Sequence, residues 1–122
     1  MAHIMIIDDE PMICEMLDSL FSGSGYTVTT APDGELGLAL YKDNPADVVI
    51  TDIIMPESDG LETIKAMRAH NAGVKIIAIS GGSRIKGIDF LEVASNLGAD
   101  HVFCKPLDND DLLNTVETCL QS

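Results

Sequence analysis

Three acidic side chains and one lysine stand where short apolar segments of the sequence end. Asp8 and Asp9 follow one such segment, Asp52 follows a second and Lys105 follows a third. In an open parallel α/β sheet, ligands bind in the crevice outside the carboxyl ends of the strands. If the apolar segments are strands of such a sheet, the three carboxylates and the ammonium group converge in that crevice.

A divalent cation is the expected partner of these carboxylates. Carboxylates this close together repel one another strongly unless a cation lies among them. Mg²⁺ suits the donor set, because it binds one or two carboxylates and keeps positions open for water and phosphate oxygens. No sulfur or imidazole ligand accompanies the cluster, which argues against zinc or copper. The sequence therefore predicts a Mg²⁺ site that includes Asp8, Asp9 and Asp52.

Lys105 adds a second positive charge, which indicates that an anion accumulates beside the metal. Phosphoryl transfer has this requirement, because negative charge builds up on the oxygens of the transferred group. Asp52 would be the nucleophile and would form an acyl phosphate. Ser80 ends another apolar segment and can offer its hydroxyl to the same group, and the small Gly81 leaves room for a phosphodonor and offers a backbone N–H.

Strand-like and helix-like patterns alternate along the chain. Continuous or alternating apolar runs are typical of strands, and apolar residues spaced three or four apart are typical of helices. The predicted strands are residues 3–7, 26–30, 47–51, 74–79 and 101–104, and the predicted helices are residues 10–22, 34–43, 61–70, 87–97 and 109–120. These five units predict an α/β fold, a doubly wound five-stranded parallel sheet with five helices covering both faces.

Individual residues are expected to start, orient and separate these elements. Asp9 is predicted to cap the first helix, with Pro11 in its first turn. Met16 and Leu36 lie on the apolar faces of the first two helices and are predicted to point inward. The composition of residues 56–60 predicts a turn.

Length and charge restrict the classes of protein to consider. The chain has 122 residues, so residues 1–122 are expected to form a single domain, with no output domain. The formal net charge of −13 should repel phosphate backbones and anionic lipids, so neither nucleic acid nor a membrane is expected as a direct partner. No apolar run approaches the ~18 residues of a membrane span, and no signal-peptide pattern is present, so we expect a cytoplasmic location.

The three cysteines show no pattern of a metal site. Cys14, Cys104 and Cys119 are odd in number and lack zinc-ligand spacing. We expect them to be small buried residues in a reducing compartment.

Five segments of the sequence occur together in an order and spacing that are highly specific. They are residues 7–11, 52–60, 79–81, 98–100 and 105–106. The set, which extends over the whole chain, resembles the receiver domain of bacterial two-component response regulators. The resemblance implies a flavodoxin-like, CheY-like fold with the strand order 2-1-3-4-5.

The resemblance also implies a set of metal ligands. Asp9 and Asp52 look like direct Mg²⁺ ligands, and Asp8 would act nearby through water. The backbone carbonyl of Ile54 would complete the protein ligands.

For the phosphoryl group, the resemblance implies contacts from three strand ends. Asp52 looks like the phosphoacceptor, and Lys105 would pair with a phosphoryl oxygen. Ser80 looks like the switch hydroxyl that moves toward the phosphoryl group, and Ile53 and Gly81 are expected to contact it.

A partner and a signalling role follow from the same resemblance. The phosphoryl group would come from a phosphohistidine on a histidine kinase or a histidine phosphotransfer protein, and a downstream target protein would respond. The chain would not be an enzyme, but a phosphoacceptor that assists its own Mg²⁺-dependent phosphotransfer and dephosphorylation. We expect a stand-alone response regulator that signals by a conformational switch or a phosphorelay; the alternatives are an excised domain of a larger regulator and a binding module that works without phosphorylation.

One position departs from the family pattern. Receivers often carry Phe or Tyr three positions before the lysine, where this chain has Val102, flanked by His101 and Phe103. The output is therefore expected to depend more on the loop at residues 80–83 and on the start of the helix that follows it.

Two other protein classes are disfavoured by single positions. A haloacid-dehalogenase-type phosphatase places a general-acid Asp two residues after the nucleophile, where this chain has Ile54, which cannot transfer a proton. A flavodoxin-like electron carrier needs a phosphate-binding loop after the first strand, where this chain has acidic residues.

Overall fold

The computed structural model describes residues 2–55, 58–81, 84–85 and 88–121 of the chain. The strands are β1 (His3–Ile7), β2 (Thr27–Ala31), β3 (Val48–Asp52), β4 (Ile54–Met55), β5 (Ser58–Asp59), β6 (Lys75–Ser80), β7 (Arg84–Ile85), β8 (Ile88–Asp89) and β9 (His101–Cys104). The helices are α1 (Pro11–Gly23), α2 (Gly34–Asp43), α3 (Gly60–His70), α4 (Phe90–Asn96) and α5 (Asn109–Leu120).

Five of the strands form one parallel sheet in the order β2-β1-β3-β6-β9. This confirms the predicted fold class and, when these five strands are counted along the chain, the order 2-1-3-4-5. All five strands run in the same direction, so their carboxyl ends lie along one edge of the sheet. The neighbours β1 and β3 lie where the order of the strands reverses, which is the position that binds ligands in sheets of this kind.

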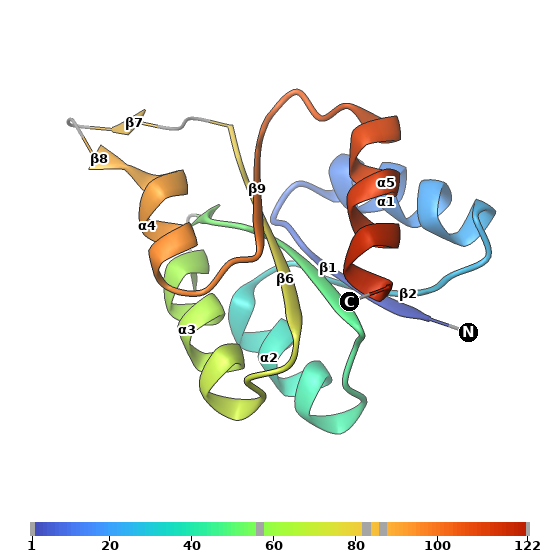
Figure 1. Ribbon diagram of the computed structural model, residues 1–122, viewed down its shortest axis with the longest axis horizontal. Helices are drawn as coiled ribbons and strands as arrows, with labels where there is room; N and C mark the ends of the chain where they lie inside the picture. The colour runs from blue at the N-terminus through green and yellow to red at the C-terminus, as the bar shows by residue number, and fades with distance from the viewer. Residues whose placement is uncertain (1, 56–57, 82–83, 86–87, 122) are drawn as a thin grey trace.

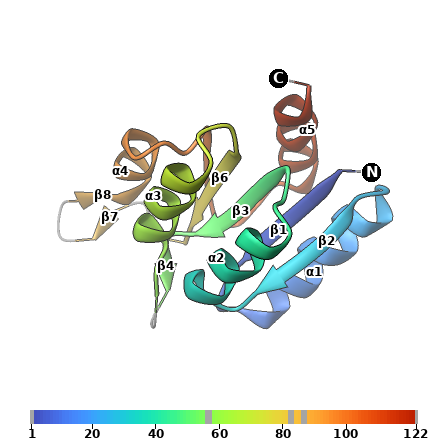
Figure 2. The same cartoon turned by 90° about the horizontal axis from the view of Figure 1, so that it is seen from below.

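Helices cover both faces of the sheet, as Figures 1 and 2 show, with α2, α3 and α4 on one face and α1 and α5 on the other. Alternate strand residues supply the two cores. The first core includes Met5, Ile7, Val49, Ile76 and Ala78 with Tyr41, Ile64, Met67 and Ala94 from the helices. The second includes Ile4, Ile6, Val48, Ile50, Ile77 and Ile79 with Leu17, Phe21, Leu112 and Val116.

Because these two cores lie on opposite faces, β1 and β3 are buried on both sides, and every residue in them is buried. This explains why the inner strands read as continuous apolar runs in the sequence. In the outer strand β2 the first four residues are exposed or half-buried, and only the last residue, Ala31, is buried.

The first helix begins one position later than the predicted cap. Glu10, not Asp9, occupies the N-cap position of α1, and its side chain makes no capping hydrogen bond. Pro11 is the first helical residue, where its missing N–H costs no hydrogen bond. In contrast, α2 and α5 have side-chain caps, because Asp33 accepts from Leu36 N and Asp108 accepts from Asp111 N.

Two predicted inward-facing side chains are instead partly exposed. Leu36 on α2 is 44% exposed, and Met16 on α1 is 38% exposed. In α2 the buried positions are Gly34, Gly37 and Tyr41. A Cβ atom at Gly37 would lie 2.5 Å from Ile7 Cδ1, so the glycine lets the helix approach the sheet more closely than a side chain would allow. The face of α2 that lies closest to the sheet is therefore the one that carries the glycines.

The loops at the carboxyl edge contain short strands that were not predicted. The predicted turn at residues 56–60 overlaps β5, which pairs antiparallel with β4 just before the turn, and residues 56–57 lie outside the described residues. The helix predicted to start at residue 87 begins at Phe90, because β7 and β8 pair before it. Figure 1 shows the pair β7–β8 next to the first residues of α4, away from the main sheet.

Arg68 on α3 joins the loops that precede β6 and β9. Its guanidinium group lies 3.0 Å from a carboxylate oxygen of Asp100, and the same oxygen accepts a hydrogen bond from Ile76 N at 2.8 Å. Arg68 also donates to main-chain carbonyl groups, those of Ala72, Val74 and Gly98. This network fixes the amino ends of β6 and β9, opposite the ends that carry the predicted site residues.

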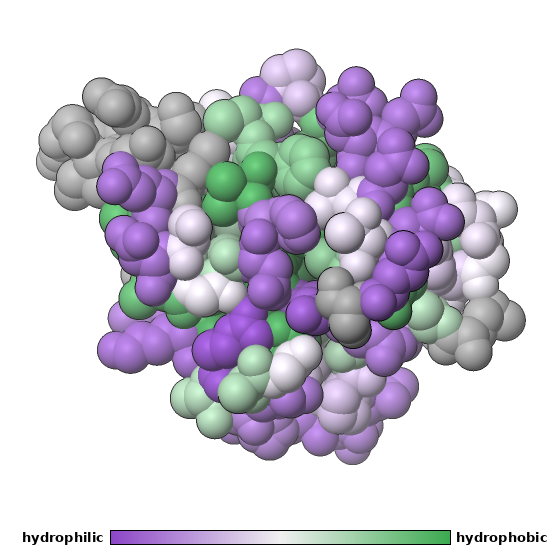
Figure 3. All heavy atoms as spheres, in the orientation of Figure 1, coloured by the Kyte–Doolittle hydropathy of each residue, from purple (hydrophilic) through white to green (hydrophobic). Residues whose placement is uncertain are grey.

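The surface agrees with an acidic chain. Hydrophilic side chains cover most of the face in Figure 3, with a smaller hydrophobic area near the upper centre. No helix among the described residues is long and apolar enough to cross a membrane. Of the three cysteines, Cys119 is buried as expected and Cys14 is half-buried, whereas Cys104 is exposed because it lies on the edge strand β9.

Candidate functional site

Three strand ends at the same edge of the sheet bring the predicted site residues together. Asp8 follows β1, Asp52 ends β3, and Lys105 follows β9. Each strand end is anchored to its neighbour by the main chain: Asp8 N donates to Ala31 O at 3.1 Å, and Lys105 N donates to Ser80 O at 2.8 Å. The sheet itself therefore holds the site residues in position.

The ammonium group of Lys105 is the centre of this site. Its Nζ atom lies 3.1 Å from Asp52 Oδ2, 3.2 Å from Asp8 Oδ2 and 3.2 Å from Glu10 Oε1. The side chains of Asp8 and Asp52 are almost completely buried, and that of Lys105 is 15% exposed. The single ammonium group thus neutralises part of the charge of three carboxylates, two of which are buried.

Glu10 is a site residue that was not predicted. Its carboxylate forms a group with those of Asp8 and Asp52, whose ligand atoms all lie within 4.8 Å of one another. Its side chain is 58% exposed, so it forms the solvent side of the cluster. The signal in the sequence was a third acidic residue directly after Asp8 and Asp9, which was interpreted only as part of a motif.

Asp8 carries the main electrostatic strain of the site. Burial raises the pKa of its carboxyl group, and the charge of Asp52 raises it further, against the main-chain hydrogen bond from Glu10 and the charge of Lys105. Asp8 Oδ1 accepts that hydrogen bond at 2.9 Å. Asp8 Oδ2 is buried and, despite its ion pair with Lys105, accepts no hydrogen bond from the described residues. A buried carboxylate oxygen that accepts no hydrogen bond needs a compensating positive charge, which a bound cation would supply.

Lys105 is held in its charged form. Burial alone would lower the pKa of its ammonium group, but the hydrogen bond to Asp52 and the charges of Asp52 and Asp8 outweigh that effect and raise the pKa above its ordinary value. The group is therefore positively charged throughout the physiological pH range.

The other predicted contact residues surround Asp52 and Lys105. Ser80 is fully buried at the end of β6. Gly81 lies next to the Lys105 side chain, since a Cβ atom at Gly81 would be 3.8 Å from Lys105 Cδ. Ile53 N donates to Ile79 O at 3.0 Å, so in this structure that N–H is engaged by the neighbouring strand.

Gly60, the first residue of α3, lies unusually close to the main chain of Asp52 and Ile53. A Cβ atom at Gly60 would lie 2.3 Å from Asp52 O and 2.4 Å from Ile53 Cα. No side chain fits at this distance, so the start of α3 packs directly on the main chain of the predicted nucleophile. The sequence marked Gly60 only as a turn residue.

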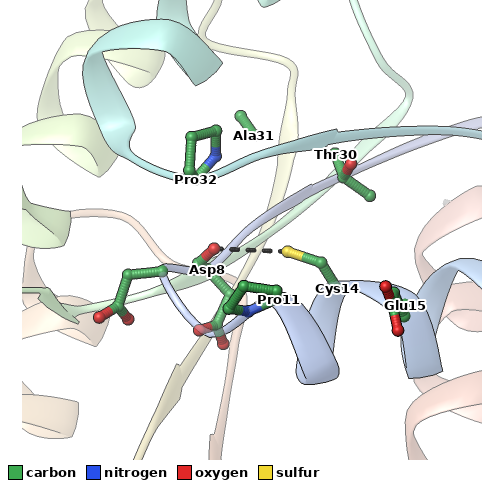
Figure 4. Close-up of a pocket in the computed structure, with 8 residues that line it drawn as sticks. Asp8, Pro11, Cys14, Glu15, Thr30, Ala31 and Pro32 are labelled. Atoms are coloured by element: carbon green, nitrogen blue, oxygen red, sulfur yellow. Dashed lines mark hydrogen bonds between the residues drawn. The ribbon is translucent and has the colours of Figure 1, made fainter.

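The structure places Asp9 differently from Asp8. Asp9 is exposed and lies outside the group formed by Asp8, Glu10 and Asp52. It lines a pocket of about 260 Å³ between the start of α1 and the end of β2, together with Cys14 and Pro32. Figure 4 shows Cys14 pointing toward the main chain of Asp8, whose carbonyl accepts its Sγ–H at 3.3 Å.

The residues present fit a hard divalent cation. The donor set consists of carboxylate oxygens, one of them buried without a hydrogen bond, and it contains no sulfur or imidazole ligand. The predicted carbonyl ligand, that of Ile54, belongs to the first residue of β4, two positions after Asp52. The site can therefore bring a cation, a carboxylate that can act as a nucleophile and an ammonium group together at the carboxyl edge of the sheet.

The sheet is doubly wound and parallel, with acidic residues after β1, an aspartate at the end of β3 and a lysine after β9, which is the arrangement that the resemblance to receiver domains implied. The family model described as "Response regulator receiver domain" matches residues 4–117. The chain therefore belongs to the response regulator receiver domain family.

Known proteins with related sequences and folds support this assignment. The chain is 34% identical over 119 residues to the regulatory protein AtoC of Escherichia coli, an alignment that covers 98% of this chain and 25% of AtoC. The CheY-like receiver domain protein of Methanospirillum hungatei superposes with a TM-score of 0.91 at 26% identity, covering 99% of this chain and 94% of that one. The chemotaxis protein CheY4 of Vibrio cholerae superposes with a TM-score of 0.87 at 28% identity, covering 98% of each chain.

Proposed function

We propose that this receiver domain accepts a phosphoryl group on Asp52 from a phosphohistidine of a histidine kinase or a histidine phosphotransfer protein. The observation that supports this most directly is the position of Lys105 Nζ, 3.1 Å from Asp52 Oδ2 in a buried cluster of carboxylates. The buried aspartate supplies a nucleophile, and the lysine supplies a positive charge where the phosphoryl oxygens would arrive.

In the proposed reaction, Asp52 attacks the phosphorus atom of the donor while the bond from phosphorus to the histidine nitrogen breaks. A phosphoryl group on Asp52 carries about −2 charge. Lys105 would pair with one of its oxygens, and Ser80 would donate its hydroxyl hydrogen bond to another. The main-chain N–H of Gly81 would add a contact, and that of Ile53 would do so once it leaves the carbonyl of Ile79. The chain thus positions and stabilises the group without acting on a separate substrate.

Mg²⁺ is the proposed cofactor, with Asp8, Asp9, Asp52 and the carbonyl of Ile54 as its ligands. When bound, it would neutralise the carboxylates and the charge of the phosphoryl oxygens. The buried oxygen of Asp8, which accepts no hydrogen bond from the described residues, supports a cation at this position. Asp9 is exposed in the structure, so we propose that its carboxylate turns toward the site when the metal binds.

The signalling role is proposed in two forms, a conformational switch and a phosphorelay. The chain spans about a quarter of AtoC but 98% of CheY4. The stand-alone role, the lack of direct contact with nucleic acid and the identity of the downstream target protein stay predictions. The output is predicted to depend on residues 80–83, of which residues 82–83 lie outside the described residues.

This prediction came from Val102, which stands where many receivers have an aromatic residue. The Val102 side chain is 39% exposed.

Phosphorylation by a small donor tests the proposal. Intact mass is measured after incubation with acetyl phosphate, with and without Mg²⁺, beside an Asp52→Asn control. We expect a Mg²⁺-dependent gain of one phosphoryl group that is absent in the control. A folded protein that gains no mass from acetyl phosphate or from any phosphohistidine donor would instead support a phosphorylation-independent binding module.

A further inference from the structure

The three carboxylates around Lys105 differ in how easily they can move. An ammonium group has three N–H donors, and three carboxylate oxygens lie 3.1 to 3.2 Å from Lys105 Nζ. Asp8 and Asp52 are fixed by burial, whereas the Glu10 side chain is 58% exposed. An incoming phosphoryl oxygen therefore meets an ammonium group that already contacts three carboxylates, and Glu10 is the partner that can leave.

The position of Glu10 in the helix shows that its side chain is directed to the site. It occupies the N-cap position of α1, where a side-chain oxygen commonly accepts a hydrogen bond from the helix. The structure gives it no such capping bond, and its Oε1 atom accepts a hydrogen bond from Lys105 Nζ at 3.2 Å. The same residue's N–H donates to Asp8 Oδ1, which fixes the base of its side chain beside the cluster.

We propose that the Glu10 carboxylate is an electrostatic gate on the phosphoacceptor: it holds Lys105 on the solvent side of the unphosphorylated site, and it must leave when the phosphoryl group arrives. This inference rests on the proposed function. Its physical basis is charge: a phosphodonor that brings about −2 charge is repelled by a carboxylate at the same ammonium group. Glu10 is thus a positioning residue that acts through Lys105 and slows phosphorylation by anionic donors.

Glu10→Gln tests the gate, because it removes the charge and keeps the shape of an exposed side chain. The rate of phosphorylation by acetyl phosphate in saturating Mg²⁺ is measured by intact mass. We expect an increase of at least about 5-fold at low ionic strength, because even two unit charges about 4 Å apart in water repel by about 1 kcal/mol. The increase should fall below about 2-fold in about 1 M salt, where the screening length is about 3 Å.

Glu15→Gln is the matched control, since it removes the same charge from an exposed position on the same helix, and the ion pairs of Lys105 do not include Glu15. We expect it to change the rate by less than about 1.5-fold. An equal acceleration in both variants would overturn the gate, because the effect would then come from net charge alone.

The remaining outcomes separate this inference from the proposed function. If the wild-type protein is phosphorylated and Glu10→Gln is not faster, the gate is wrong and the phosphoacceptor stands. A slower variant that needs more Mg²⁺ would make Glu10 a metal ligand, which also overturns the gate. If the wild-type protein accepts no phosphoryl group from any donor, both proposals are wrong.

Discussion

The main-chain N–H of Lys105 donates to the carbonyl of Ser80 at 2.8 Å, so the two residues predicted to bind phosphoryl oxygens are joined by one hydrogen bond of the sheet. Their side chains extend from neighbouring strand ends on this shared frame. Because the bond involves only main-chain atoms, substitutions at either position change the chemistry of the site and leave its frame in place.

Removing the charge of Lys105 is expected to destabilise the metal-free protein. Lys105→Met leaves Asp8 and Asp52 buried together without their cation, and we expect a loss of about 2 kcal/mol in the free energy of unfolding at pH 7. Thermal melts should show a lower Tm, with the loss reduced by Mg²⁺. An unchanged Tm at pH 7 without Mg²⁺ would mean that the carboxylates do not depend on Lys105.

Neutralising Asp8 is expected to act in the opposite direction. The pKa of Asp8 is raised above its ordinary value of 3.8, so its charged form costs stability at pH 7. The wild-type protein regains that free energy as the pH falls through the raised pKa. Asp8→Asn should therefore be more stable without Mg²⁺ by about 1 kcal/mol at pH 7, an increase of a few degrees in Tm.

The pH dependence and the metal provide the controls for this prediction. The advantage of Asp8→Asn should shrink as the pH falls through the raised pKa of Asp8, because the folded wild-type protein then takes up a proton on that carboxylate. Mg²⁺ should raise the Tm of the wild-type protein more than that of the variant, since it binds the folded state through this carboxylate. If Asp8→Asn is less stable than the wild type at pH 7, the account of the strained carboxylate is wrong.

Gly60 is expected to tolerate no side chain. Its Cβ position lies 2.3 Å from Asp52 O, so Gly60→Ala must shift the main chain of the nucleophile. We expect a loss of about 3 kcal/mol in stability and slower phosphorylation. Gly23→Ala is the matched control, because nothing lies within 4 Å of its Cβ position, and it should be neutral or slightly stabilising. Equal effects of the two substitutions in urea unfolding would contradict the close contact.

Arg68 is expected to matter for stability and not for phosphorylation. Its guanidinium group binds Asp100 and carbonyl groups at the amino ends of β6 and β9, away from Lys105. Arg68→Lys keeps the charge but loses the planar set of donors, so we expect a loss of about 1 to 2 kcal/mol. Acetyl phosphate should still phosphorylate the folded variant at the wild-type rate. A large change in that rate would show that this network is coupled to the site.

The sheet was predictable from the sequence because its inner strands are buried on both faces. β1, β3 and β6 appear as unbroken apolar runs, and a run of that length has no other place in a small α/β domain. The site followed from the same pattern, since Asp8, Asp52 and Lys105 stand at the ends of such runs. Their convergence needed the parallel direction of the strands and the strand order that the resemblance implied.

The parts that were not predicted depend on packing between elements. Leu36 is exposed because Gly34, Gly37 and Tyr41 take the buried positions of α2. The role of Gly60 depends on the approach of α3 to the main chain of β3, which no periodicity records. Glu10 was missed because its sequence position suggests the start of a helix, whereas its side chain contacts Lys105, which is 95 residues away.

The identity of the phosphorylated residue tests the central claim most directly. The phosphorylated protein is reduced with borohydride, which converts an aspartyl phosphate to homoserine, and is then digested with trypsin. Cleavage after Lys42 and Lys65 places Asp52 in one peptide and Asp8, Asp9 and Glu10 in another. We predict homoserine at position 52 alone, in a Mg²⁺-dependent amount; modification in the N-terminal peptide, or none in peptide 43–65, would contradict the account.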